Sequence, residues 1–212
     1  MSDNRWIERE ISTARDLLNQ AHDAIQQGNV RNARGQVDEA LAILDMADAE
    51  GESDEQVELR ARALNERGLI FQHTGDTADA YRLHREAADA LVQLSEVRVG
   101  YLASAAAIRL NYGQMALLEE EYDSAEREND KALDYVERLE EHDEASALSL
   151  ALGARQNLTA LHSFRGSFDR AADHAEIAVR VRNGLRTLRH APLHGEPGRD
   201  DWLDALRSAL GR

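Results

Sequence analysis

The sequence predicts an all-α protein built from four similar helix pairs. One pattern of residues recurs four times at a spacing of 45 to 47, starting at Ala21, Gly68, Gly113 and Thr159. Two alanine columns share this register, one formed by Ala33, Ala80, Ala125 and Ala171 and the other by Ala40, Ala87, Ala132 and Ala178. Aromatic residues make up only 5 % of the chain, and its 2 prolines follow the last repeat, which favours helices over a sheet. A period of this size is typical of a solenoid, in which each unit buries its apolar face against its neighbours.

Each repeat reads as two helices joined by a tight turn. Apolar periodicity and turn residues predict helices at about 4–26, 30–49, 54–74, 77–96, 98–119, 122–140, 143–165 and 168–190. Glycine marks the turn of the first, second and fourth pairs, at Gly28, Gly75 and Gly166. Glu120 and Glu121 occupy this place in the third pair, so we expect a looser or more helical turn there.

The repeats form one predicted domain, residues 1–190, followed by a polar linker over 191–199. Residues 200–212 predict a short amphipathic helix with Trp202, Leu203 and Leu206 on one face. This helix either caps the last repeat or docks on a partner protein.

Bulk composition excludes several classes of function. The formal net charge is −15, with no run of basic residues, so we expect no nucleic-acid binding. The chain has no cysteine, its start is charged rather than apolar, and no apolar stretch approaches the roughly 20 residues that cross a bilayer. We therefore expect a cytoplasmic protein without a membrane segment.

The repeated residues resemble the tetratricopeptide repeat (TPR) family. The family's pattern is a small residue, a large one three positions later, a Gly-Asp-Tyr-like turn and two alanines seven apart. The alanine columns match in all four units, and Phe71 is the best match to the large position. The resemblance implies a right-handed superhelix of four antiparallel helix hairpins. The usual period is about 34 residues, so this chain is similar to the long-helix branch of the family.

The resemblance also implies a ligand groove lined by the first helix of each pair. Asn19, Asn111 and Asn157 stand two residues before the small position, where the family holds an extended peptide with a ladder of side-chain amides. Glu66 interrupts this ladder, and the neighbouring Asn65 is expected to substitute in part. The alternative is that these amides bond to helix ends or to neighbouring repeats.

Other positions on the same helix faces complete the predicted groove. Cationic and titratable groups fall in the first two pairs, and apolar groups in the last two, so a ligand with an acidic end and an apolar end is expected. The additional groove residues are Arg15, His22, Arg62, Leu69, His73, Gln114, Leu118 and Phe164.

These features predict an adaptor or regulatory module that binds a peptide segment of another protein. The alternatives are a self-assembling scaffold, forming a homo-oligomer, and a sensor of a small signalling peptide. No phosphate-binding glycine loop, nucleophile elbow or HExxH pattern occurs, so we expect no enzyme activity, no metal and no cofactor.

Overall fold

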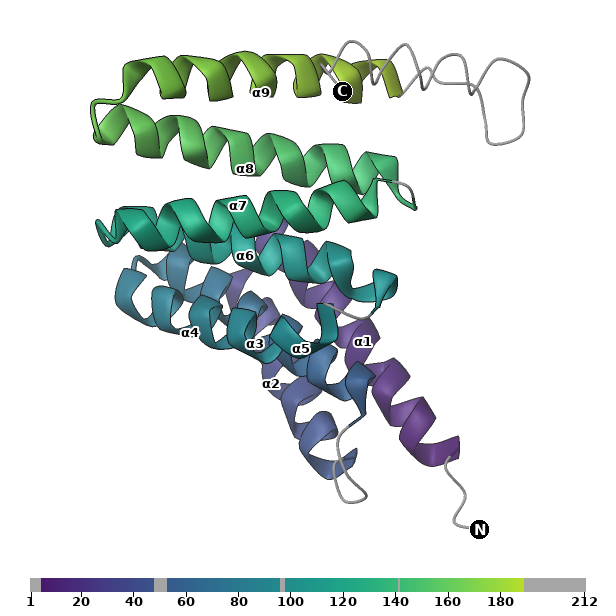
Figure 1. Ribbon diagram of the computed structural model, residues 1–212. Coiled ribbons are helices and arrows are strands. Elements are labelled where there is room, and N and C mark those ends of the chain that lie inside the picture. The colour runs from purple at the N-terminus through teal and green to yellow at the C-terminus, as the bar shows by residue number, and fades with distance from the viewer. Residues whose placement is uncertain (1–4, 48–52, 96–97, 141, 189–212) are drawn as a thin grey trace, which may run out of the picture.

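The computed structural model describes residues 5–47, 53–95, 98–140 and 142–188, and all the regular structure in these ranges is helical (Figure 1). This result confirms the all-α prediction. In chain order the elements are α1 (Arg5–Gln26), α2 (Val30–Ala47), α3 (Asp54–Thr74), α4 (Thr77–Ala90), α5 (Val92–Ser95), the 3-10 turn η2 (Val99–Tyr101), α6 (Leu102–Leu118), α7 (Tyr122–Leu139), α8 (Glu144–Phe164) and α9 (Phe168–Leu188). None of the described helices is long and apolar enough to cross a membrane.

The long helices pack as sequential pairs: α1 with α2, α3 with α4, α6 with α7 and α8 with α9. The second helix of each pair contacts the first helix of the next, which produces the stack of α6 to α9 seen in Figure 1. The first helices also contact one another in series, α1 with α3, α3 with α6, and α6 with α8. Four helices that are distant in sequence therefore form one continuous layer.

Small residues bring the helices of a pair together. The alanines of both columns are buried, with exposed fractions between 0 and 6 %. At two of the small positions even a methyl group would collide with the partner helix. A Cβ on Gly68 would lie 2.7 Å from the His84 ring, and a Cβ on Gly113 would lie 2.4 Å from Asn129 Nδ2. Each glycine thus makes room for a buried polar side chain on the second helix of its pair.

The turns inside the four pairs share one geometry, including the turn that lacks glycine. Each has a residue in the left-handed region, which is Gly28, Gly75, Glu120 or Gly166, with φ of 74°, 85°, 61° or 71°. In the third pair the Glu120 N–H donates to Leu117 O at 3.2 Å and the Glu121 N–H to Ala116 O at 2.8 Å, the same two bonds that close the glycine turns. The expectation of a looser or more helical turn is wrong, because these bonds hold Glu120 in a conformation that normally favours glycine.

The predicted helix 77–96 is interrupted at Leu91, which separates α4 from α5. The Arg109 guanidinium donates to the Ala88 carbonyl at 3.1 Å. In a continuous helix this carbonyl would accept from the backbone of residue 92. This contact lies near the end of α4, and because Arg109 comes from α6 it cannot be anticipated from the sequence of α4.

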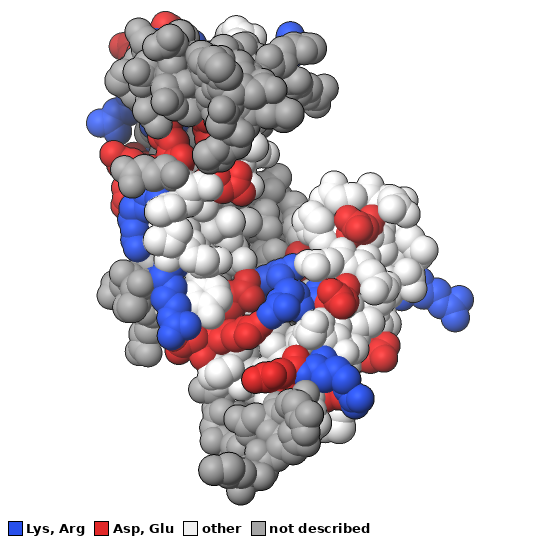
Figure 2. Space-filling view, turned by 90° about the vertical axis from the view of Figure 1, so that its right-hand side faces the viewer, with Lys and Arg blue, Asp and Glu red and all other residues white. Residues whose placement is uncertain are grey.

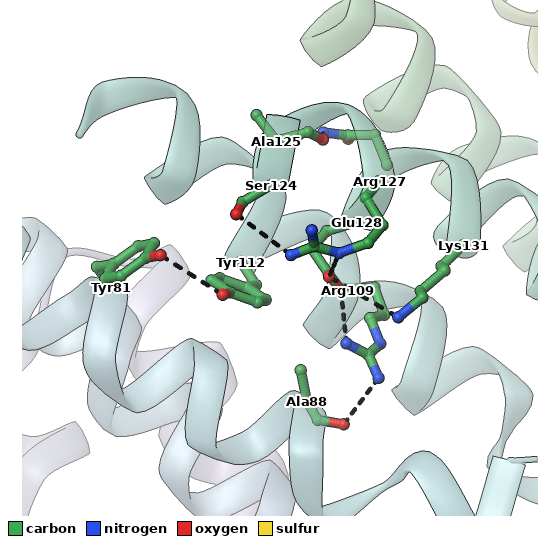
Figure 3. Close-up of polar contacts among 10 residues, drawn as sticks. Tyr81, Ala88, Arg109, Tyr112, Ser124, Ala125, Arg127, Glu128 and Lys131 are labelled. Carbon is green, nitrogen blue, oxygen red and sulfur yellow. Dashed lines mark hydrogen bonds and ion pairs between the residues drawn. The ribbon is translucent and has the colours of Figure 1, made fainter. Parts of the chain in front are cut away.

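A buried ion pair joins α6 to α7. Arg109 and Glu128 are 4 % and 2 % exposed, and Arg109 Nη1 donates to Glu128 Oε2. Figure 3 shows the guanidinium between this carboxylate and the Ala88 carbonyl. Arg127 Nε donates to the other Glu128 oxygen at 3.0 Å, and this bond raises the pKa of Arg127. One carboxylate therefore ties the third pair together, and Arg109 extends the link to α4.

The predicted linker 191–199 and the amphipathic helix 200–212 lie outside the described residues. The alternatives for that helix, a cap or a docking segment, stay predictions.

Candidate functional site

The layer formed by α1, α3, α6 and α8 carries a pocket of about 730 Å³. All of its lining residues belong to these four helices, which are the first helices of the four pairs. Six of the predicted groove residues line it, namely Asn19, His22, Arg62, Asn65, Leu69 and Asn111. The rest of the lining comes from Asp23, Gln26, Glu66, Ala103, Ser104, Ala107, Ile108, Leu110 and Ser146.

Polar contacts join α1 to α3 along one side of the pocket. Arg62 Nη2 donates to Asn19 Oδ1 at 2.8 Å. His22 Nδ1 lies 3.2 Å from Glu66 Oε1, across the same pair of helices. The hydrogen bond to Glu66 raises the pKa of His22 and outweighs the opposing effect of partial burial. The basic groups of this wall are therefore already engaged by acceptors on the protein.

Asn65 lies at the centre of a second group of contacts, between α3, α4 and α6. Its Oδ1 is 3.0 Å from His84 Nδ1 and accepts from Asn111 Nδ2 at 2.9 Å. His84 is fully buried, and desolvation lowers its pKa to about 4, so the ring is neutral at pH 7. A neutral ring donates to Asn65 through Nδ1–H. The amide of Asn65 thus connects two helix pairs.

Asn157 lies outside the pocket. Its Nδ2 donates to Asn129 Oδ1 at 3.0 Å and contacts the Leu110 carbonyl at 3.3 Å. Together with the Asn111 bond to Asn65, this arrangement matches the alternative in which the amides bond to neighbouring repeats. The amide nitrogens of Asn111 and Asn157 therefore each donate to a partner within the protein.

Five other predicted groove residues also lie away from the pocket lining. Arg15 forms an ion pair with Glu55 across α1 and α3. The others are exposed: His73, Gln114, Leu118 and Phe164. Leu118 and Phe164 are 57 % and 71 % exposed and lie at the ends of α6 and α8, where the turns begin.

The most informative residue missed by the sequence analysis is Glu66. The repeat pattern treated it as a break in the ladder, yet it lines the pocket and is only 5 % exposed. Ser104 was missed as well, and its hydroxyl donates to Glu58 Oε1 at 2.6 Å. A carboxylate at a position where the other repeats carry asparagine was a sequence signal that could have identified Glu66. The sequence could not show that this carboxylate is buried, because its burial depends on packing with α1 and α6.

A separate acidic hollow lies between the third and fourth pairs, lined mainly by α7. This second pocket, of about 590 Å³, is lined by Asp130, Leu133, Asp134, Glu137, Glu140 and Arg155. Burial raises the pKa of Asp130 and lowers the pKa of Arg155. On the face shown in Figure 2, Lys and Arg side chains lie among Asp and Glu side chains rather than in a separate patch.

No family model matches the chain, and no curated protein matches it. Among solved structures, the chain is similar to BtubC (BKLC) from P. vanneervenii, at 15 % sequence identity and a TM-score of 0.45. The match covers 90 % of this chain and 94 % of BtubC. A likeness at this level carries no conclusion about fold or function.

Proposed function

We propose that the protein is an interaction module of the TPR kind that binds an extended peptide segment of a partner protein. In this proposal the four helix pairs are antiparallel hairpins of a right-handed superhelix, and the pocket belongs to its concave face. The observation that carries the proposal is the pocket itself, which is lined by the first helices of all four pairs and by no others. The protein acts in the cytoplasm by binding, as an adaptor or regulator, and not by catalysis.

The pocket has the size and mixed chemistry of a ligand site. Its volume of about 730 Å³ falls within the roughly 300–1,000 Å³ of typical ligand pockets. Leu69, Ile108 and Leu110 supply apolar wall, while Asn19 and Asn111 supply amides. Apolar wall suits peptide side chains, and amides suit peptide groups regardless of sequence.

The test uses random heptapeptides displayed on beads and screened with the full chain. Selected peptides are resynthesised, and their affinities are measured by calorimetry for the wild type and for Ala107→Leu. Ala107 lines the pocket from α6, so a larger side chain there occupies part of its volume. We expect the affinity to fall about tenfold or more, which corresponds to about 1.4 kcal/mol.

Ala172→Leu is the matched control, because Ala172 is an exposed helical alanine of α9 that does not line the pocket. This variant should keep the wild-type affinity. Equal affinities for the wild type and a correctly folded Ala107→Leu would place peptide binding elsewhere and refute the proposal.

Self-association is a second candidate function, favoured by two exposed aromatic side chains. Phe164 and Phe168 are 71 % and 70 % exposed and flank the turn between α8 and α9. Exposed aromatic groups that cluster in this way are typical of protein contacts. Sedimentation velocity of the wild type and of the double variant Phe164→Ser, Phe168→Ser tests this function. A wild type that stays monomeric at all concentrations would eliminate it.

A further inference from the structure

One carboxylate oxygen in the pocket lacks a partner. The Glu66 side chain is 6 % exposed, and its Oε1 faces His22 Nδ1 at 3.2 Å. Its Oε2 is buried and has no hydrogen-bond partner among the described residues. An unsatisfied buried acceptor is costly, and more so when it is charged. Because Glu66 lines the pocket, a bound ligand can supply the missing donor once the carboxylate turns Oε2 toward the pocket.

Several of the protein's own donors along the pocket are already in use. The guanidinium, amide and hydroxyl donors bond to acceptors of the protein: Arg62 to Asn19, Asn111 to Asn65 and Ser104 to Glu58. The pocket therefore has less to offer to ligand acceptors than the sequence suggested. Among the described lining residues, the buried side-chain atom without a partner is an acceptor, Glu66 Oε2, so a ligand satisfies it with a donor.

The charges around Glu66 favour a donor that is also a cation. Asp23 and Glu66 line the pocket, and Glu58 Oε1 lies 3.9 Å from Arg62 Nε beside it. These three carboxylates face one guanidinium, and protonation of His22 still leaves an excess of one negative charge. A cationic ligand group reduces this excess, while an anionic group increases it.

We propose that Glu66 receives a primary ammonium group of the bound peptide. An ammonium group is compact and has three N–H donors, so it can satisfy Oε2 within a confined site. The group is either the amino terminus of the peptide or a lysine side chain. This inference rests on the proposed function, and it replaces the expected acidic end of the ligand with a cationic one.

Four heptapeptide bead libraries without arginine test the inference on the full chain. They combine a free or an acetylated amino terminus with the presence or absence of lysine. We expect tight binders only from libraries that contain an amine, with acetylated lysine-free peptides about 10- to 100-fold weaker. Binding confined to free-terminus peptides identifies the amino terminus, and binding of acetylated lysine peptides identifies the side chain.

Glu66→Gln should remove the preference for amine-containing peptides, because the amide keeps the shape but loses the charge. Glu39→Gln is the control for the loss of one negative charge: Glu39 is an exposed carboxylate of α2 that does not line the pocket, so this variant should retain the preference. If a variant fails to fold, the comparison of the four libraries on the wild-type protein still tests the inference.

Two outcomes separate this inference from the proposed function. Acetylated lysine-free peptides that bind as tightly as the others, and are blocked by Ala107→Leu, would overturn the ammonium site while the peptide pocket stands. A folded Glu66→Gln variant that keeps the full preference for amine-containing peptides would also overturn the ammonium site and leave the peptide pocket intact. Failure of all four libraries to give binders would overturn the peptide pocket, and the inference with it.

Discussion

Replacing Gly113 with alanine should destabilise the protein, although alanine is the better helix former. The new Cβ would lie 2.4 Å from Asn129 Nδ2 and 3.3 Å from the Ala125 carbonyl. Asn129 cannot simply move aside, because it is 1 % exposed and its Nδ2 donates to Ala125 O at 2.8 Å. Its Oδ1 also accepts from Asn157 at 3.0 Å.

Displacing Asn129 breaks one buried and one partly buried hydrogen bond, at about 1 kcal/mol each or more where a group stays unsatisfied. The gain in helix propensity from glycine to alanine is about 0.5–1 kcal/mol. The net loss in the free energy of unfolding is therefore about 1–3 kcal/mol, the usual range for overpacking. Urea unfolding followed by circular dichroism at 222 nm measures it.

Gly35→Ala is the control within the same chain. Gly35 lies inside α2, is exposed, and a Cβ there would meet nothing within 4 Å. This variant should gain about 0.5–1 kcal/mol from propensity alone. If Gly113→Ala is as stable as Gly35→Ala, the close approach of α6 and α7 is not what requires glycine, and the reasoning fails.

Three further predictions concern stability, and urea unfolding measures each. Glu120→Gly should stabilise by about 1 kcal/mol, because glycine adopts the left-handed conformation of that turn without strain. Glu128→Gln should cost about 3–5 kcal/mol, since it leaves the buried Arg109 charge unpaired. Acid should destabilise the protein through His84, because burial lowers its pKa from the ordinary value of 6.5, which the unfolded chain retains, to about 4. Between pH 4 and 6.5 the unfolded chain binds more protons than the folded protein. His84 therefore contributes up to about 3 kcal/mol to the free energy of unfolding above pH 6.5, and this contribution is lost as the pH falls toward 4. His84→Asn, which places the residue type of Asn129 at the equivalent position of the second pair, should flatten this dependence.

Each of these predictions has a contrary result. A Glu120→Gly protein no more stable than the wild type would mean that the turn is not strained. A Glu128→Gln loss below about 1 kcal/mol would place the ion pair in an effectively solvated site. Burial also lowers the pKa of His174, so this residue contributes to acid sensitivity in the same direction as His84, whereas the Glu66 hydrogen bond raises the pKa of His22 and acts in the opposite direction. An acid sensitivity unchanged by His84→Asn would therefore assign the effect to other groups.

Local sequence signals predicted the helices well. The predicted 54–74 matches α3 in both bounds, because Ser53 and Gln56 form a capping box at its start and Gly75 adopts the left-handed conformation at its end. The break after Ala90 was not predicted, and the contact beside it, from Arg109 of α6 to the Ala88 carbonyl, is not visible in the sequence of α4. The prediction for the turn at Glu120 was wrong because backbone hydrogen bonds outweigh the preference of a non-glycine residue for a negative φ.

The candidate site was predictable only in part. Repeat spacing placed Asn19, Glu66 and Asn111 at equivalent positions of the first helices, and all three line the pocket because these helices meet in one layer. It could not tell which amides bond to one another across repeats, as with Asn157 and Asn129. Nor could it show that Glu66 is buried with one oxygen unsatisfied, since this depends on packing among α1, α3 and α6.

The most direct test of the central claim is to map a bound peptide on the protein by nuclear magnetic resonance. A peptide selected on the full chain is titrated into isotope-labelled protein, and backbone amide shifts are followed. We predict that the largest changes fall within 19–26 of α1, 62–69 of α3 and 103–111 of α6, the segments that line the pocket. Changes confined to the second helices α2, α4, α7 and α9 would contradict a binding site on the shared layer of first helices.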